Sequence, residues 1–80
     1  MNPEEFKALH EQCLEAFEAY RTEATLTWEL LGHCRPERLT LQQRARIQNQ
    51  RLRENDAYKR YNDLRSRLFA AARIGYSDSN

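Results

Sequence analysis

The stretch GHCRPERLT, residues 32–40, decides the fold of this chain, because it holds the only helix-breaking residues in its central part. Gly32 lowers helix propensity, and the Pro36 ring clashes with the preceding turn of a helix. The sequence on either side of this connector lacks internal Gly and Pro and is rich in good helix formers. We therefore predict an all-α chain, with one helix over about residues 3–31 and a second over about residues 41–74, joined as a long antiparallel hairpin.

Residues suited to cap a helix stand at the start of both predicted segments. Asn2 is a good N-cap, Pro3 occupies the favoured first helical position, and Glu5 follows three residues after the cap. Thr40 and Gln43 have the spacing of a capping box at the start of the second segment. Both helices are thus predicted to begin at a side-chain cap.

Glycine is expected just beyond the end of each helix. Gly32 fits the position that follows a helix, where a left-handed backbone favours glycine, and Gly75 is expected to end the second helix. We predict a single helical domain over residues 1–75, followed by a flexible polar tail over residues 76–80.

The first helix is strongly amphipathic. At 100° per residue its apolar side chains fall in one stripe: Phe6, Leu9, Cys13, Ala16, Phe17, Tyr20, Ala24, Trp28 and Leu31. The opposite face is acidic and carries Glu4, Glu11, Glu15, Glu18 and Glu29. One face is therefore expected to pack and the other to face solvent.

The second helix is less regular and leaves two architectures open. Leu41, Ala45, Gln48 and Leu52 share one face, whereas Tyr58, Tyr61, Leu64, Leu68 and Ala72 share another, and the change falls at residues 54–56. We favour one continuous helix that meets different neighbours along its length. The alternative is a break near Asn55, which would cap a third helix and give a three-helix bundle.

A lone two-helix hairpin cannot cover the aromatic stripe of the first helix, and 80 residues form only a thin core. We therefore expect two chains to pair as a homodimeric four-helix bundle, a common architecture and symmetry. The residues expected in its core or dimer interface are Phe6, Leu9, Cys13, Phe17, Tyr20, Trp28, Leu31, Tyr61, Leu64 and Leu68.

The near-neutral total charge of +1 conceals a division between the two halves. Residues 1–31 hold seven acidic and two basic side chains, a net charge of −5, and residues 32–80 hold eleven basic and five acidic side chains, a net of +6. Such asymmetry suggests a charged partner or charge-guided assembly.

Arginine recurs at every seventh position of the second helix, at Arg46, Arg53, Arg60 and Arg67. Such a row can follow the phosphates of a nucleic acid or contact an acidic partner. At the edge of a helical bundle the same arginines cover the apolar seam and pair with glutamates. The low net charge favours the edge interpretation over nucleic acid.

The chain lacks the sequence signals of an enzyme. It has no glycine-rich phosphate loop, no Ser-centred elbow and no HExxH spacing. Cys13 lies near the middle of the first predicted helix and Cys34 lies beyond its end, about 30 Å away by the helical rise. One chain therefore cannot gather both with His10 and His33 around a metal or join them in a disulfide. We predict no catalytic residue, no metal site and no cofactor.

These observations predict a small cytoplasmic interaction or regulatory module that acts as a homodimer and contacts another protein. A nucleic-acid-binding bundle that uses the arginine row is the alternative. No apolar run approaches the length of a membrane span, and no membrane partner is expected.

Overall fold

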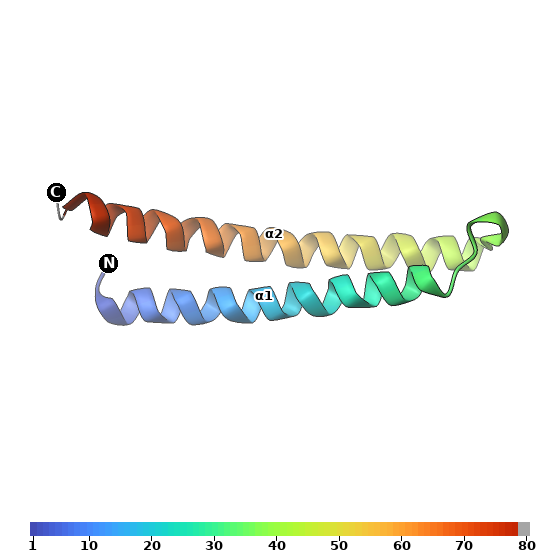
Figure 1. The fold of residues 1–80 in the computed structure, drawn as a ribbon, viewed down its shortest axis with the longest axis horizontal. Coiled ribbons are helices and arrows are strands. Elements are labelled where there is room, and N and C mark those ends of the chain that lie inside the picture. The colour runs from blue at the N-terminus through green and yellow to red at the C-terminus, as the bar shows by residue number, and fades with distance from the viewer. Residues whose placement is uncertain (79–80) are drawn as a thin grey trace.

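The chain folds back on itself as a helical hairpin in the computed structural model, which describes the backbone of residues 1–78 and the side chains of residues 1–73 (Figure 1). Helix α1 spans Pro3–Gly32, a short 3-10 helix η1 spans Pro36–Arg38, and helix α2 spans Leu41–Asp78. The molecule measures 59 × 19 × 15 Å. The predicted all-α hairpin is confirmed.

Both predicted caps form. The Oδ1 atom of Asn2 accepts a hydrogen bond from the backbone N–H of Glu5 at 2.7 Å. Thr40 and Gln43 make the reciprocal bonds of a capping box, since each backbone N–H donates to the other's side-chain oxygen, at 3.0 and 3.1 Å. These bonds satisfy N–H groups that have no partner inside the helix, and they fix where each helix begins.

The helix ends differ from the prediction. Gly32 is the last residue of α1, and His33 caps the helix with φ −93° and ψ −4°. No glycine in the described part of the chain has a positive φ, so the left-handed position expected at Gly32 is wrong. The stop comes instead from the connector around Pro36, which starts η1.

Helix α2 runs four residues farther than predicted, through Gly75 to Asp78. Glycine in a helix interior costs only about 1 kcal/mol relative to alanine, which continued backbone hydrogen bonding can offset. The predicted tail over residues 76–80 is therefore helical as far as Asp78, and its last two residues, 79–80, lie outside the described part of the chain.

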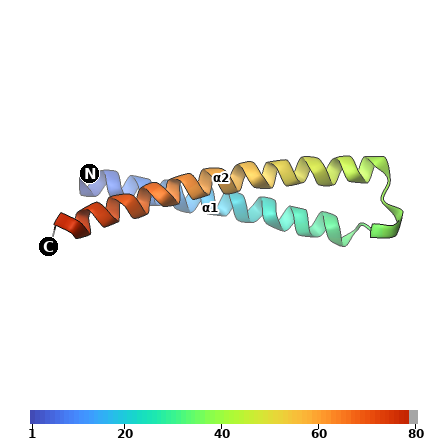
Figure 2. The same cartoon turned by 90° about the horizontal axis from the view of Figure 1, so that it is seen from above.

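The helices meet along a seam with a seven-residue repeat. In α1 the buried and half-buried residues at alternating spacings of three and four are Phe6, Leu9, Cys13, Ala16, Tyr20, Glu23, Thr27 and Leu30. In α2, up to residue 73, the buried and half-buried residues are Gln43, Ile47, Gln50, Glu54, Ala57, Tyr61, Leu64, Leu68 and Ala71. This unbroken 3-4 alternation is the repeat of an antiparallel coiled coil, and Figure 2 shows the two helices crossing at a shallow angle.

The seam passes through residues 54–56 without interruption. Glu54 and Ala57 both belong to it, while Asn55 and Asp56 are exposed. The alternative three-helix bundle with a break near Asn55 is therefore wrong, because α2 is one helix across this segment.

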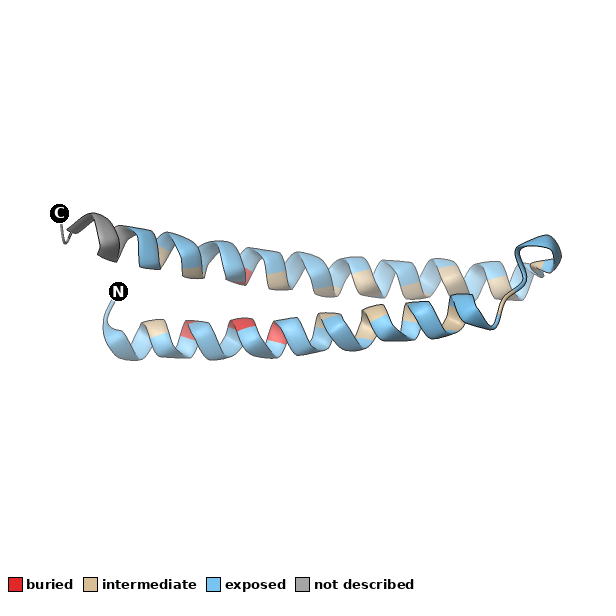
Figure 3. Cartoon of the chain, viewed as in Figure 1, coloured by how far each residue is buried: buried red, intermediate tan, exposed pale blue. Residues whose placement is uncertain are grey.

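The apolar core occupies only the half of the hairpin that is far from the connector (Figure 3). Its buried members are Leu9, Cys13, Ala16 and Leu64, against which Tyr61 and Leu68 pack. Toward the connector the seam becomes polar and carries Glu23, Thr27, Gln43, Gln50 and Glu54. A single chain therefore holds a thin core.

Candidate functional site

A second apolar stripe runs along α1 beside the seam. Its members again alternate at spacings of three and four residues. We call this set the second stripe: His10, Leu14, Phe17, Arg21, Ala24, Trp28 and Leu31. Because a helix turns 100° per residue, this stripe lies roughly a quarter turn from the seam, on one side of the hairpin. Leu14 is 52% exposed, Phe17 37%, Trp28 74% and Leu31 43%.

Helix α2 adds two aromatic side chains on the same side of the hairpin. Tyr58 is 50% and Phe69 61% exposed. The Tyr58 ring lies 5.2 Å from that of Tyr20, and the guanidinium of Arg65 lies 5.1 Å from the centre of the Phe69 ring. Together the two helices present what we call the apolar face: Leu14, Phe17, Trp28, Leu31, Tyr58 and Phe69.

Aromatic contacts join the apolar face to the seam beneath it. The Phe17 ring lies 5.3 Å from the Tyr61 ring at an angle of 52°, and Tyr20 stacks on Tyr61 at 6.2 Å with an angle of 1°. Phe17 also lines a shallow groove together with Leu14 and Phe69. Rings held by neighbouring rings lose little further freedom on binding, so this part of the face is preorganised.

The predicted interface residues divide into two groups. Phe6, Leu9, Cys13, Tyr20, Tyr61, Leu64 and Leu68 lie between the two helices of one chain. Phe17, Trp28 and Leu31 lie on the apolar face instead. Leu14, Tyr58 and Phe69 were missed as members of this face. The signal that finds the α1 residues is the second seven-residue repeat, which runs one position out of phase with the seam.

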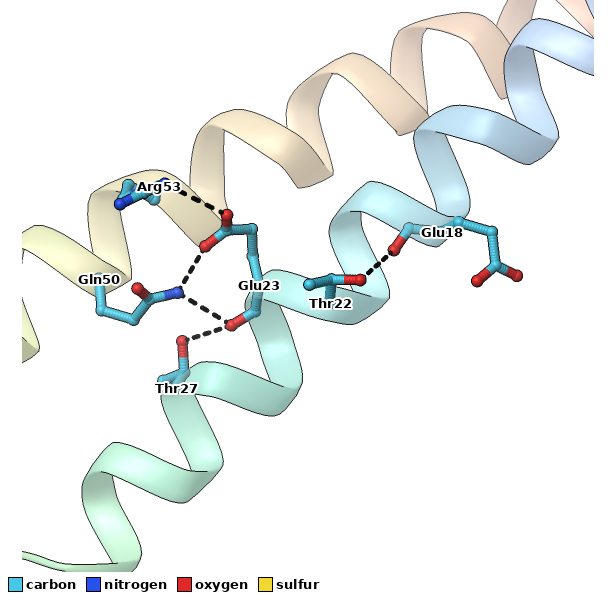
Figure 4. A network of polar contacts seen from close by, with 6 residues as sticks. All are labelled: Glu18, Thr22, Glu23, Thr27, Gln50 and Arg53. Carbon is cyan, nitrogen blue, oxygen red and sulfur yellow. Dashed lines mark hydrogen bonds and ion pairs between the residues drawn. The ribbon is translucent and has the colours of Figure 1, made fainter.

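A polar layer interrupts the seam near its middle (Figure 4). The Nε2 atom of Gln50 donates hydrogen bonds to the backbone carbonyl of Glu23 at 3.0 Å and to its Oε2 at 2.7 Å. The hydroxyl of Thr27 donates to the same carbonyl at 3.0 Å. Arg53 reaches the Glu23 carboxylate at 3.7 Å, but its side chain is 70% exposed, so this ion pair contributes little to stability.

The arginine row of Arg46, Arg53, Arg60 and Arg67 lies exposed along one edge of α2. Arg53 is paired with Glu23, and Arg60 and Arg67 share a depression with the acidic side chains of Asp56 and Asp63. Acidic neighbours weaken the attraction of such a row for phosphate. This arrangement supports the edge interpretation more than a nucleic-acid track.

The two cysteines lie in different surroundings. Cys13 is buried in the core, Cys34 is half-buried in the connector, and both are free thiols. In the described part of the chain, no three His, Cys, Asp or Glu side chains gather as metal ligands. Across the same residues, none of the helices is both apolar and long enough to span a bilayer.

Comparison with protein-family models, with curated proteins and with solved structures finds no match for this chain. The geometry of the hairpin is therefore the basis for assigning a function. Its clearest feature is the apolar face, which places six large side chains in contact with solvent.

Proposed function

We propose that this protein is a non-enzymatic helical interaction module that acts as a homodimer, and that it dimerises through the apolar face. The observation that carries the proposal is the exposure of six large apolar side chains on one side of the hairpin. Large apolar side chains gathered on one exposed side of a soluble protein mark interaction sites.

The energetics favour a covered face. Full burial of a Leu or Phe side chain stabilises a protein by about 1.5–3 kcal/mol, whereas an exposed ion pair contributes about 0–1 kcal/mol. Covering the exposed parts of six large apolar side chains therefore contributes more than an exposed ion pair does. Among residues 1–73 four side chains are buried, which is a small core for a domain of this length. A second copy is the simplest source of the missing apolar surface, because two-fold dimers are the commonest oligomers.

Dimerisation through the apolar face leaves the charged surfaces outward. These are the acidic row of α1, with Glu4, Glu11 and Glu18, and the arginine row of α2. Complementary charge steers encounters between proteins and selects among partners. The dimer would thus act as an adaptor or regulatory subunit that offers two charged surfaces to another protein.

A light-scattering mass tests the proposal directly. At micromolar concentration we expect twice the 9.6 kDa mass of one chain. Leu14→Glu places a charge on the apolar face and should raise the dimer dissociation constant roughly tenfold to a hundredfold. Each loss of about 1.4 kcal/mol in binding free energy is a factor of ten, and both copies carry the change.

Leu52→Glu is the matched control. Leu52 has the same 52% exposure as Leu14 but lies on the outer side of α2, away from the apolar face. It should leave the dissociation constant unchanged within about twofold, as surface substitutions usually do. A monomeric wild-type protein, or equal effects of the two substitutions, would contradict the proposal.

A further inference from the structure

The geometry of the apolar face specifies how a second copy binds, an inference that rests on the homodimer proposed above. We infer that two chains pack with their connectors at opposite ends of the bundle, α1 against α1 and α2 against α2, around a two-fold axis perpendicular to the helices. The axis passes α1 at the height of residues 22–23. It passes α2 close to Asn55, because Tyr20 contacts Tyr58 and Glu23 contacts Gln50 and Arg53 across the seam.

This axis pairs apolar residues of α1 with each other. Phe17 and Trp28 lie at nearly equal distances on either side of it, so Phe17 of one protomer faces Trp28 of the second copy. Leu14 and Leu31 are related in the same way, and Arg21 faces the small side chain of Ala24. Every large apolar residue of the second stripe thereby meets another one.

The same axis also pairs residues of α2 with each other. Leu41, which is 83% exposed, and Phe69, which is 61% exposed, lie equally far from Asn55 on opposite sides. Each therefore meets the other across the axis. Asn55 meets its own copy, with which its amide can form hydrogen bonds, and Arg51 meets the ring of Tyr58, an arrangement suited to a cation–π contact. One axis thus pairs large apolar side chains on both helices, although it also brings Arg44 near Arg65 of the second copy.

The other two-fold arrangement, with both connectors at one end, is less favourable. It would place α1 of one protomer against α2 of the other, so that Trp28 and Leu31 would meet Arg44, Gln48 and Arg51. That arrangement matches the acidic helix to the basic one, but it buries the apolar stripe against polar side chains. Since apolar burial contributes more than exposed charge pairs, the like-to-like arrangement prevails.

The available surface is sufficient for a stable dimer. The broad side of the hairpin measures 59 by 19 Å, or about 1,100 Å². A standard stable interface buries about 800 Å² on each partner. On α1 the apolar face runs from Leu14 to Leu31, and on α2 the paired residues run from Leu41 to Phe69. At a rise of 1.5 Å per residue these spans are about 25 Å and about 40 Å long.

Distances between spin labels on the two chains of the dimer test the arrangement. Cys13→Ala leaves Cys34 as the only thiol, so one label reports on the connector end. Adding Glu4→Cys to a Cys13→Ala/Cys34→Ser chain labels the other end. From the rise of 1.5 Å per residue we expect separations of about 35 Å for Cys34 and about 55 Å for residue 4.

Thr22→Cys in the same cysteine-free background is the control. Thr22 is exposed and lies at the height of the axis, so its labels should be separated by about 20–30 Å in either arrangement, as expected from helix spacings of 8–10 Å and the added labels. Circular dichroism of each labelled chain checks that the hairpin is intact.

The outcomes separate this inference from the proposed function. A dimer with long distances at both ends supports the arrangement. A dimer in which the labels at Cys34 and at residue 4 are both within about 25 Å places the connectors together and overturns it, while the homodimer proposal stands. A monomeric mass overturns both.

Discussion

Glu23 occupies a seam position that coiled coils usually fill with an apolar side chain. Its carboxylate is held by Gln50 at 2.7 Å, and only 19% of its side chain is exposed. A half-buried carboxylate loses part of its hydration, which is unfavourable unless a hydrogen-bond donor replaces the lost water. Gln50 is therefore the residue that makes Glu23 tolerable at this position. Polar seam residues of this kind can fix the register of paired helices at some cost in stability.

The contribution of this polar layer can be measured by removing its donor. Gln50→Ala deletes both hydrogen bonds to Glu23 and should lower the free energy of unfolding by about 1–2 kcal/mol, because the carboxylate stays half-buried. The double change Glu23→Leu/Gln50→Leu should raise it above wild type, since it replaces a polar pair with apolar burial. Urea denaturation at fixed protein concentration gives both values.

Gln42→Ala is the control for the polar layer, because Gln42 is an exposed residue of the same helix on the side away from the apolar face. It should change stability by no more than about 0.5 kcal/mol. Equal effects of Gln42→Ala and Gln50→Ala would show that the bonds to Glu23 contribute nothing.

At the scale of the elements, the sequence predicts both helices but misplaces part of their seam. A stripe drawn at 3.6 residues per turn on α1 passes through Trp28 and Leu31, whereas the seam passes through Thr27 and Leu30. Two helices that wrap around each other follow a repeat of 3.5 residues, which departs from the straight stripe by about 20° per heptad. The two descriptions agree at Phe6 and separate in the last two turns.

Supercoiling also explains why only part of the candidate site can be predicted from the sequence. Caps, helix boundaries near the connector and the core residues of the first turns depend on local sequence, which is fully visible. The exposure of Trp28 depends on supercoiling, which arises only when α2 is present. The sequence alone does not reveal that Gln43, Gln50 and Glu54 lie in the seam, because the nearby Leu41 and Leu52 are apolar and are therefore expected there instead.

The continuity of α2 has a sharp test at Asp56. If Asn55 capped a new helix, Asp56 would be its first residue, where proline is favoured. In the continuous helix Asp56→Pro removes a backbone hydrogen bond and clashes with the preceding turn, so we expect a loss of about 3 kcal/mol or more in the free energy of unfolding. Chemical denaturation followed by circular dichroism measures it.

Leu41→Pro is the companion variant, because Leu41 is the first residue of α2 and follows Thr40, whose side chain caps the helix. Leu41→Ala serves as its reference, since it also removes the side chain that meets Phe69 of the second copy. Relative to Leu41→Ala, the change in stability should be less than about 1 kcal/mol, because proline is accepted at that position. A mild effect of Asp56→Pro, close to that of Leu41→Pro, would restore the three-helix interpretation.

At the scale of the whole molecule, the charge division follows the two helices. Helix α1 holds seven acidic and two basic residues, a net charge of −5, and α2 holds nine basic and four acidic residues, a net charge of +5. The ion pair of Arg53 with Glu23 neutralises little of this charge, because it is long and the Arg53 side chain is largely exposed. Assembly therefore determines whether like or unlike charges meet.

The inferred dimer sets like charges side by side, and this determines the sign of its salt dependence. With α1 against α1 and α2 against α2, Arg44 approaches Arg65 of the second copy, and the two acidic helices also adjoin. Salt shortens the range of this repulsion, from a Debye length of about 10 Å at 0.1 M to about 3 Å at 1 M. Raising NaCl from 0.05 to 0.5 M should therefore lower the dimer dissociation constant by roughly twofold or more, because screening relieves repulsion and added salt also strengthens apolar burial. Sedimentation equilibrium across this range measures it. A dissociation constant that rises with salt would mean that α1 of one protomer lies against α2 of the other, since only that pairing places opposite charges in contact.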